Sequence, residues 1–113
     1  MENQSVEEGK TIAIISYLTL IGLIIAFVMN NDKKNDFASF HIRQSIGIFT
    51  LFFMSFIFLF IIAFIVYIPF LSTIVNSLIF VLWVLGFIGS LQGEKKKVPI
   101  VGEHFQEWFK SIG

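Results

Sequence analysis

The sequence predicts an all-α membrane protein, a single integral membrane domain over residues 1–113, with three membrane-spanning helices and two short interfacial helices. Composition is the first reason, because 56% of the residues are apolar and only 14% are charged, against about 25% charged residues in an ordinary soluble domain. The second reason is residues 44–93, which contain no Asp, Glu, Lys, Arg or His. A single helix of that length would measure about 75 Å, and a hydrocarbon layer measures about 30 Å, so the stretch must fold back.

The first predicted span covers residues 11–29, which carry no charged side chain and are long enough to cross a bilayer. Residues 1–10 are acidic and lack the positive start of a secretory signal, so we expect them to remain as an external N-terminal tail. Gly22 and Ala26 stand four residues apart, and such a pair of small residues lets another helix approach closely. The same spacing is frequent by chance in apolar helices, so both interpretations stay open.

A polar segment follows, and it predicts a cytoplasmic loop within residues 30–44. Phe37 and Phe40 recur there at helical spacing, which predicts an interfacial helix over residues 36–44 with its aromatic rings toward lipid. The guanidinium of Arg43 is expected to extend to lipid phosphates.

Pro69 marks the turn between the second and third predicted spans, residues 45–68 and 73–91. Proline lacks a backbone N–H and disfavours helix in the residue before it, so the second helix must end there. Asn76 is the most polar side chain of the charge-free stretch, and we expect it to bond either a neighbouring helix or nearby loop carbonyls. Three small residues further along are candidates for close helix packing: Gly86, Gly89 and Ser90.

The tail over residues 92–113 is predicted to lie in the cytoplasm and to contact the membrane surface. It begins with three consecutive lysines: Lys95, Lys96 and Lys97. Basic side chains beside a span attract anionic lipid headgroups. An amphipathic helix is predicted over residues 102–112, either in the headgroup layer or docked in the groove of a partner. Its apolar face carries three aromatic rings: Phe105, Trp108 and Phe109.

The basic side chains set the predicted orientation. With three spans, seven of the eight lysines and arginines fall on the side of residues 30–44 and 92–113, and only Lys10 falls on the other side. Because cytoplasmic segments carry the excess of Lys and Arg, the loop and the C-terminus are predicted inside and the N-terminus outside. A re-entrant first segment would change this count, and the length of residues 11–29 argues against re-entry.

The sequence offers little material for catalysis, because the predicted spans contain no charged residue or histidine and the chain contains no cysteine. His41 is either a pH-sensing or substrate-binding group or an ordinary interfacial side chain, and the second interpretation is favoured. Glu103, His104 and Glu107 resemble half of a metal site, but a solvated helix face is the favoured interpretation. We therefore expect no enzymatic activity, no metal and no cofactor, and the zero net charge gives no reason to expect a nucleic-acid partner.

Two stretches carry a resemblance to a known family. Residues 37–45 (FASFHIRQS) and residues 93–102 (GEKKKVPIVG) are similar to segments of small bacterial proteins related to the chloroplast inner-envelope import component, the twenty-kilodalton translocon subunit. The resemblance implies an all-helical, multi-pass protein of the bacterial cytoplasmic (inner) membrane without known enzymatic activity. It also implies, by analogy with the plastid members, a part in protein translocation or assembly.

We therefore predict a non-enzymatic inner-membrane subunit that binds anionic lipid headgroups and associates with other membrane proteins. The alternative is a homo-oligomeric channel or transporter, whose polar lining would be small: Ser16, Thr19, Ser55, Asn76 and Ser77. An enzyme that acts at the interface through His41 or His104 ranks last.

Overall fold

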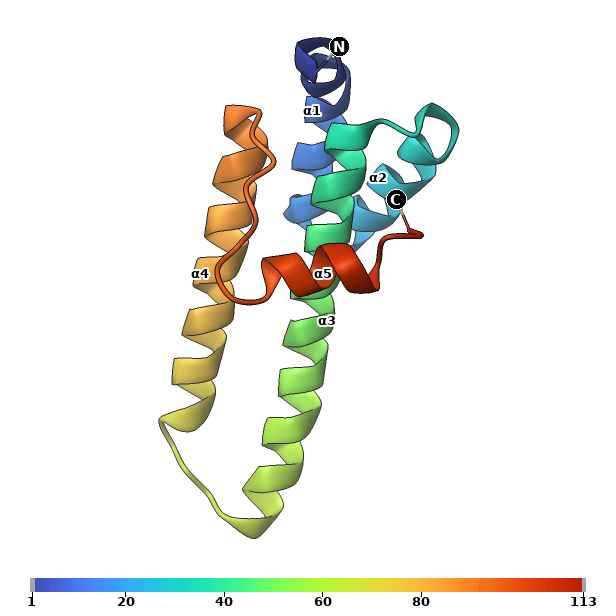
Figure 1. The fold of residues 1–113 in the computed structure, drawn as a ribbon. Helices are drawn as coiled ribbons and strands as arrows, with labels where there is room; N and C mark the ends of the chain where they lie inside the picture. Colours follow the sequence, from blue (N-terminus) through green and yellow to red (C-terminus); the bar gives the residue numbers. More distant parts are fainter. Residues whose placement is uncertain (1, 113) are drawn as a thin grey trace.

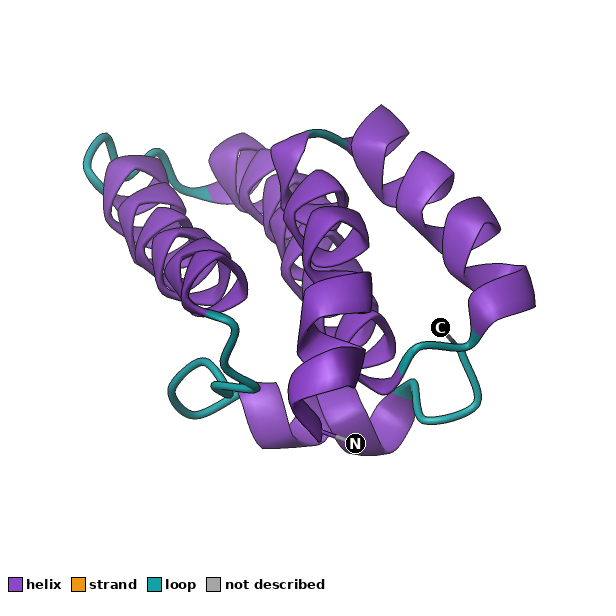
Figure 2. Cartoon of the chain, turned by 90° about the horizontal axis from the view of Figure 1, so that it is seen from above, coloured by secondary structure: helices purple, strands orange, loops and turns teal. Residues whose placement is uncertain are grey.

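Five α-helices make up the part of the protein described by the computed structural model, which is residues 2–112, with side chains described for residues 6–112. In chain order they are α1 (Glu2–Leu18), α2 (Leu20–Lys33), α3 (Asp36–Ile65), α4 (Leu71–Gln92) and α5 (Gly102–Trp108). α1 and α3 pack together at the centre, with α2 on one side and α4 on the other (Figure 2). The hairpin of α3 and α4 extends beyond the other helices, so the molecule is elongated, 53 × 22 × 22 Å (Figure 1). The predicted all-α fold is confirmed.

Among the described residues, two helices are long and apolar enough to cross a membrane, α3 with 30 residues and α4 with 22. At about 1.5 Å per residue they measure about 45 Å and about 33 Å, against a hydrocarbon layer of about 30 Å. Much of their surface consists of exposed Phe, Ile, Leu and Val side chains. The predicted hairpin around Pro69 is present, with α3 ending at Ile65 and α4 beginning at Leu71.

The prediction of three membrane-spanning helices is not confirmed, because the first predicted span is broken. α1 ends at Leu18, and α2 begins at Leu20 after Thr19, which has extended backbone angles. The Thr19 hydroxyl accepts a hydrogen bond from the Gly22 N–H at 3.0 Å. A threonine in this position starts a helix because it satisfies an N–H that has no partner in the first turn. Hydropathy counts apolar residues and does not detect such a cap.

The break turns the chain back, so α2 packs against α1 instead of continuing it (Figure 1). This close approach requires Gly22, because a Cβ atom there would lie 2.5 Å from the Ile15 carbonyl oxygen. As a result, the start of α1, the connection between α2 and α3 and the end of α4 lie at one end of the molecule (Figure 1). The predicted placement of the N-terminal tail and residues 30–44 on opposite sides of a membrane is therefore not confirmed.

The predicted interfacial helix over residues 36–44 is the first part of α3, and its aromatic rings are buried. Phe37 and Phe40 pack edge-on against the ring of His41, with centroid distances of 4.8 and 5.0 Å. The prediction that these rings face lipid is wrong, because α1 and the segment after α4 cover this part of α3.

The predicted amphipathic helix of the tail is shorter than expected and docks on its own chain. α5 crosses α3 (Figure 1), and the ring of Phe105 lies directly on Gly47. Phe105 is buried there, whereas Trp108 remains exposed. A side chain at position 47 would occupy the place of the Phe105 ring. α5 can therefore pack against α3 in this position only because residue 47 is a glycine.

Candidate functional site

A buried group of polar side chains joins α1, α3 and the segment after α4. Tyr17 comes from α1, His41 and Gln44 come from α3, and all three are fully buried. Tyr17 Oη lies 2.6 Å from His41 Nδ1, and Gln44 Nε2 lies 2.9 Å from Tyr17 Oη. We call these three side chains the polar cluster.

The partners fix the direction of each hydrogen bond and the tautomer of His41. Glu94 O lies 2.8 Å from His41 Nε2, and a carbonyl oxygen can only accept, so Nε2 carries the proton. Nδ1 of the neutral ring is then an acceptor, and the Tyr17 hydroxyl donates to it. Gln44 Nε2 donates in turn to the Tyr17 oxygen. The donors therefore run in one direction, from Gln44 through Tyr17 and His41 to the backbone of Glu94.

Gln44 extends the polar cluster along the segment that follows α4. Its Nε2 also donates to Lys96 O at 3.2 Å, and its Oε1 accepts from Val98 N at 2.9 Å. Within residues 6–112, no buried side-chain nitrogen or oxygen lacks a hydrogen-bond partner. Because an unpaired buried polar group is costly, the complete set of bonds favours this one arrangement over alternatives.

Two further contacts tie α4 to α1 and α1 to α3 beside the polar cluster. Trp83 Nε1 donates at 2.6 Å to Tyr17 O, a carbonyl in the last turn of α1 that has no partner within its own helix. Ser16 Oγ donates to Ala13 O, so Ser45 Oγ is the donor in the 3.0 Å bond between the two serines. These bonds give α1 a fixed position between the two long helices.

The geometry gives the polar cluster a positioning role. Both ring nitrogens of His41 and both polar atoms of the Gln44 side chain are engaged by groups of the chain itself. The interpretation of His41 as an ordinary interfacial side chain is wrong, because the ring is enclosed by helices and by the backbone at Glu94.

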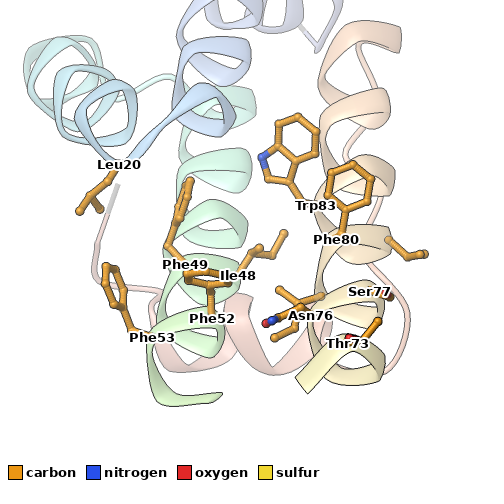
Figure 3. A pocket seen from close by; sticks show the side chains of 12 residues that line it. Leu20, Ile48, Phe49, Phe52, Phe53, Thr73, Asn76, Ser77, Phe80 and Trp83 are labelled. Atoms are coloured by element: carbon orange, nitrogen blue, oxygen red, sulfur yellow. The ribbon is translucent and has the colours of Figure 1, made fainter. Parts of the chain in front are cut away.

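A groove of about 860 Å³ lies between α3 and α4, on the side of the polar cluster that faces the helical hairpin turn. Its walls are mainly Ile and Phe side chains of α3 and Phe80 and Trp83 of α4, with Leu20 at one end (Figure 3). Three polar side chains of α4 line the other end, toward the connection between α3 and α4: Thr73, Asn76 and Ser77. We call this space the groove.

The small residues predicted for close packing lie inside the chain. Five of them are buried in α2 and α4: Gly22, Ala26, Gly86, Gly89 and Ser90. A Cβ atom at Gly86 would lie 2.9 Å from Tyr17 Cε1, so this face of α4 is occupied by α1 of the same chain. Asn76 differs, because its side chain is exposed in the groove (Figure 3).

The basic residues of the predicted membrane-surface region divide into two groups. Lys95, Lys96 and Lys97 have exposed side chains. Arg43 is half-buried, and its Nε and Nη2 donate to Ile112 O at 2.8 Å and to Lys110 O at 3.0 Å. The prediction that Arg43 extends to lipid phosphates is not confirmed, because these two nitrogens bind carbonyl groups near the C-terminus.

The residues of the half metal site lie on the exposed side of α5. Glu103, His104 and Glu107 are exposed, and the His104 ring stacks on Trp108 with a centroid distance of 5.1 Å, while Phe109 is half-buried. Within the described part of the chain, no group of three or more His, Cys, Asp or Glu side chains is placed to hold a metal ion.

The comparisons with known proteins find relatives that are membrane proteins. UPF0132 membrane protein MJ1443 of Methanocaldococcus jannaschii is 36% identical over 78 residues, covering 68% of this chain and 67% of that relative. The chain belongs to the UPF0132 family of membrane proteins. UPF0132 membrane protein MJ1527 of the same organism is 33% identical over 86 residues, covering 72% of this chain but only 56% of that relative. No protein-family model and no solved structure matches the chain.

The UPF0132 relatives correct the sequence-based resemblance. They are archaeal membrane proteins, so the identification with the chloroplast import component family is wrong, and the implied role in translocation loses its basis. A bacterial cytoplasmic membrane is likewise not confirmed. The two stretches that carried the resemblance have a structural meaning instead. Residues 37–45 supply His41 and Gln44, and residues 93–102 supply the backbone groups that these side chains bind.

The sequence reasoning missed Tyr17, which is the centre of the polar cluster. It is the only aromatic side chain with a polar atom within residues 11–29, and a buried tyrosine hydroxyl usually requires a hydrogen-bond partner. A second signal is that Gln44 follows His41 by three residues, which places both on one face of a helix. Together these signals predict a polar contact but not its partner.

Proposed function

We propose that the protein is a non-enzymatic membrane subunit that associates with another membrane protein through α2. The observation that carries this proposal is the exposed turn between α1 and α2, where Leu18 is 53% and Leu20 is 44% exposed. Non-helical backbone at membrane depth is tolerated only where protein covers it or where it lines a water-filled cavity. A partner that packs over this turn would supply that cover.

The exposed side of α2 supports the same proposal. Four large apolar side chains form what we call the outer face of α2: Ile21, Ile24, Ile25 and Val28. Their spacing of i, i+3, i+4 and i+7 places them on one side of the helix. α2 has 14 residues and measures about 21 Å, so it is too short to cross a hydrocarbon layer of about 30 Å. Large exposed apolar patches mark contacts with protein or membrane.

The outer face is held in a fixed position before any partner binds. At the end of α2, Asn30 Oδ1 accepts from Asn35 N at 2.9 Å, and Asn30 Nδ2 donates to Ser39 Oγ at 2.9 Å. At the other end, Thr19 caps the helix. Because the helix is already ordered, association would cost little conformational entropy.

The distribution of basic residues supports an orientation. Because the first segment folds back, the start of α1 lies at the same end of the molecule as the α2–α3 connection and the end of α4 (Figure 1), and residues 44–93 contain no lysine or arginine. Cytoplasmic segments carry the excess of Lys and Arg, so we infer that this end faces the cytoplasm, with Lys95, Lys96 and Lys97 at anionic headgroups.

A photo-crosslinking experiment tests the proposal. The photoreactive residue p-benzoylphenylalanine replaces Ile24 on the outer face or, as a matched control, Phe58 on α3; these positions are 57% and 63% exposed. After irradiation of native membranes, position 24 is expected to yield an adduct with a second protein, and position 58 to yield lipid adducts. Lipid adducts alone at both positions would contradict the proposal.

The same experiment separates the alternative of a homo-oligomeric channel or transporter. An adduct between two copies of the chain at position 24 would show that the partner is a second copy and not a different protein. This alternative has less support, because two of its five lining candidates, Ser16 and Thr19, bond within the chain.

A further inference from the structure

We propose that the groove binds one membrane phospholipid, with its acyl chains against the apolar walls and its glycerol ester region at Asn76. The site lies mainly on α3 and α4, with Leu20 of α2 only at its apolar end; none of the four side chains of the outer face of α2 lines it, and it requires no protein partner. Its test therefore succeeds or fails independently of the proposed association through α2.

The lining of the groove changes from polar to apolar along its length, as a phospholipid does. Thr73, Asn76 and Ser77 line the end toward the α3–α4 connection, and Trp83 and Leu20 lie at the other end (Figure 3). With α3 and α4 across the bilayer, the connection lies near one membrane surface. The polar end then lies at the depth of lipid ester groups, and the apolar end points to the bilayer centre. A phospholipid of that leaflet already has this orientation.

The side chain of Asn76 is a second and independent observation. It extends into the groove, and among the described residues no hydrogen bond joins it to another group of the chain (Figure 3). An amide without a partner is costly in an apolar environment. Lipid ester carbonyl groups are acceptors, and the Asn76 amide nitrogen carries two donors, so a lipid supplies the partner that the chain does not.

The polar end of the groove also lies near the start of α4. Phe70, at the N-cap position, makes no side-chain hydrogen bond to the first turn. The free N–H groups of a helix start carry a partial positive charge and favour a phosphate group. Residues 44–93 contain no lysine or arginine, so the site does not depend on a net negative headgroup, and a zwitterionic phospholipid suffices.

The dimensions of the groove favour a lipid over a helix of another protein. Its volume of about 860 Å³ falls within the range of about 300–1,000 Å³ that is usual for small-ligand sites. Thr73 and Trp83, near its two ends, are ten residues apart on α4, which is about 15 Å. A membrane-spanning helix would need a groove along a hydrocarbon layer of about 30 Å.

Native mass spectrometry of the full chain, reconstituted in phosphatidylcholine vesicles and then extracted in mild detergent, tests the proposal. Asn76→Phe fills the polar end of the groove, and Leu78→Phe adds the same ring to an exposed position of α4 that does not line the groove. Wild type and Leu78→Phe are expected to retain one phosphatidylcholine per chain. Asn76→Phe is expected to raise the dissociation constant of the lipid about tenfold, which corresponds to about 1.4 kcal/mol, and so to lower the retained fraction.

A fluorescence measurement keeps the proposal testable even where Asn76→Phe does not fold. The chain has two tryptophans, so Trp108→Phe leaves Trp83 in the groove as the single reporter. Phosphatidylcholine brominated on its acyl chains, diluted in ordinary phosphatidylcholine, is expected to quench Trp83, and Ser77→Phe is expected to weaken the quenching. Absence of both retained lipid and Trp83 quenching in wild type would overturn the proposal. Equal lipid loss in Asn76→Phe and Leu78→Phe, or a dimer without lipid, would overturn it as well.

Discussion

At the scale of single residues, the two histidines of the chain have opposite environments. His41 is fully buried and bonded at both ring nitrogens, whereas His104 is exposed and stacks on Trp108. Both lie near aromatic residues in amphipathic stretches, so the local sequence does not separate them. What separates them is the set of distant groups that reaches His41, namely the Tyr17 hydroxyl and the Glu94 carbonyl.

Replacement of His41 by phenylalanine keeps a ring of similar size and removes both nitrogens. The buried Tyr17 hydroxyl then loses its acceptor, and an unpaired buried group costs about 1–3 kcal/mol. We expect the free energy of unfolding in detergent micelles to fall by about this amount, because Glu94 is an exposed residue and its bond to His41 is only partly buried. His104→Phe is the matched control, and we expect it to change stability by no more than about 0.5 kcal/mol. Equal effects of the two substitutions would contradict the role of the polar cluster.

The tautomer of His41 gives a second residue-scale prediction. Because Nε2 donates to Glu94 O and Nδ1 accepts from Tyr17, the ring is expected to be neutral with its proton on Nε2. Nitrogen-15 NMR of histidine-labelled protein distinguishes a protonated Nε2 from a protonated Nδ1. A proton on Nδ1 would require the Tyr17 hydroxyl to turn away and would reverse the assigned donor direction.

At the scale of elements, α5 shows how a short helix depends on one contact. It has seven residues, which is too short for a stable isolated helix in water. It packs on the backbone of α3 at Gly47, which the ring of Phe105 covers. The sequence pattern predicts the apolar face of this helix, but any apolar surface satisfies that pattern. The position of Gly47 on α3 decides which surface it is.

A double-mutant cycle tests the contact between Phe105 of α5 and Gly47 of α3. Gly47→Ala introduces a Cβ atom at the Phe105 ring and is expected to destabilise the protein, and Phe105→Ala makes room for that atom. The pair is therefore expected to show a coupling of about 0.5–3 kcal/mol in the free energy of unfolding. Gly47→Ala combined with Trp108→Ala is the control, because Trp108 is exposed. Those two changes are expected to add within about 0.5 kcal/mol. Coupling of the same size in both pairs would argue against the contact.

At the scale of the whole molecule, the break at Thr19 decides the topology. A continuous helix over residues 11–29 would carry the N-terminus to the far side of a bilayer. The folded-back pair instead keeps the start of α1 near the α2–α3 connection, as the contact of Gly9 with Asn35 also shows. The hairpin of α3 and α4 then contains the two helices of the described chain that are long and apolar enough to cross a membrane.

Cysteine labelling tests this topology directly, because the chain contains no cysteine of its own. Single cysteines replace Glu7, Lys97 and Tyr67, all of which are exposed. With a membrane-impermeant maleimide, positions 7 and 97 are expected to react from the same side and position 67 from the opposite side. Labelling after detergent permeabilisation provides the control for reactivity. If position 7 reacts from the same side as position 67, the two-crossing topology is wrong and the prediction of three membrane-spanning helices holds.

The sequence by itself determines the all-α class and the hairpin around Pro69, because charge-free length and the missing N–H of proline are local properties. It also contains the cap at Thr19, but a hydropathy pattern does not weigh one capping hydroxyl against a mostly apolar segment of nineteen residues. Only the tertiary structure decides that Phe37 and Phe40 are buried and that His41 meets Tyr17 and the Glu94 backbone. The bonded groups are 24 and 53 positions apart in sequence, and pairing over such distances depends on how the helices pack.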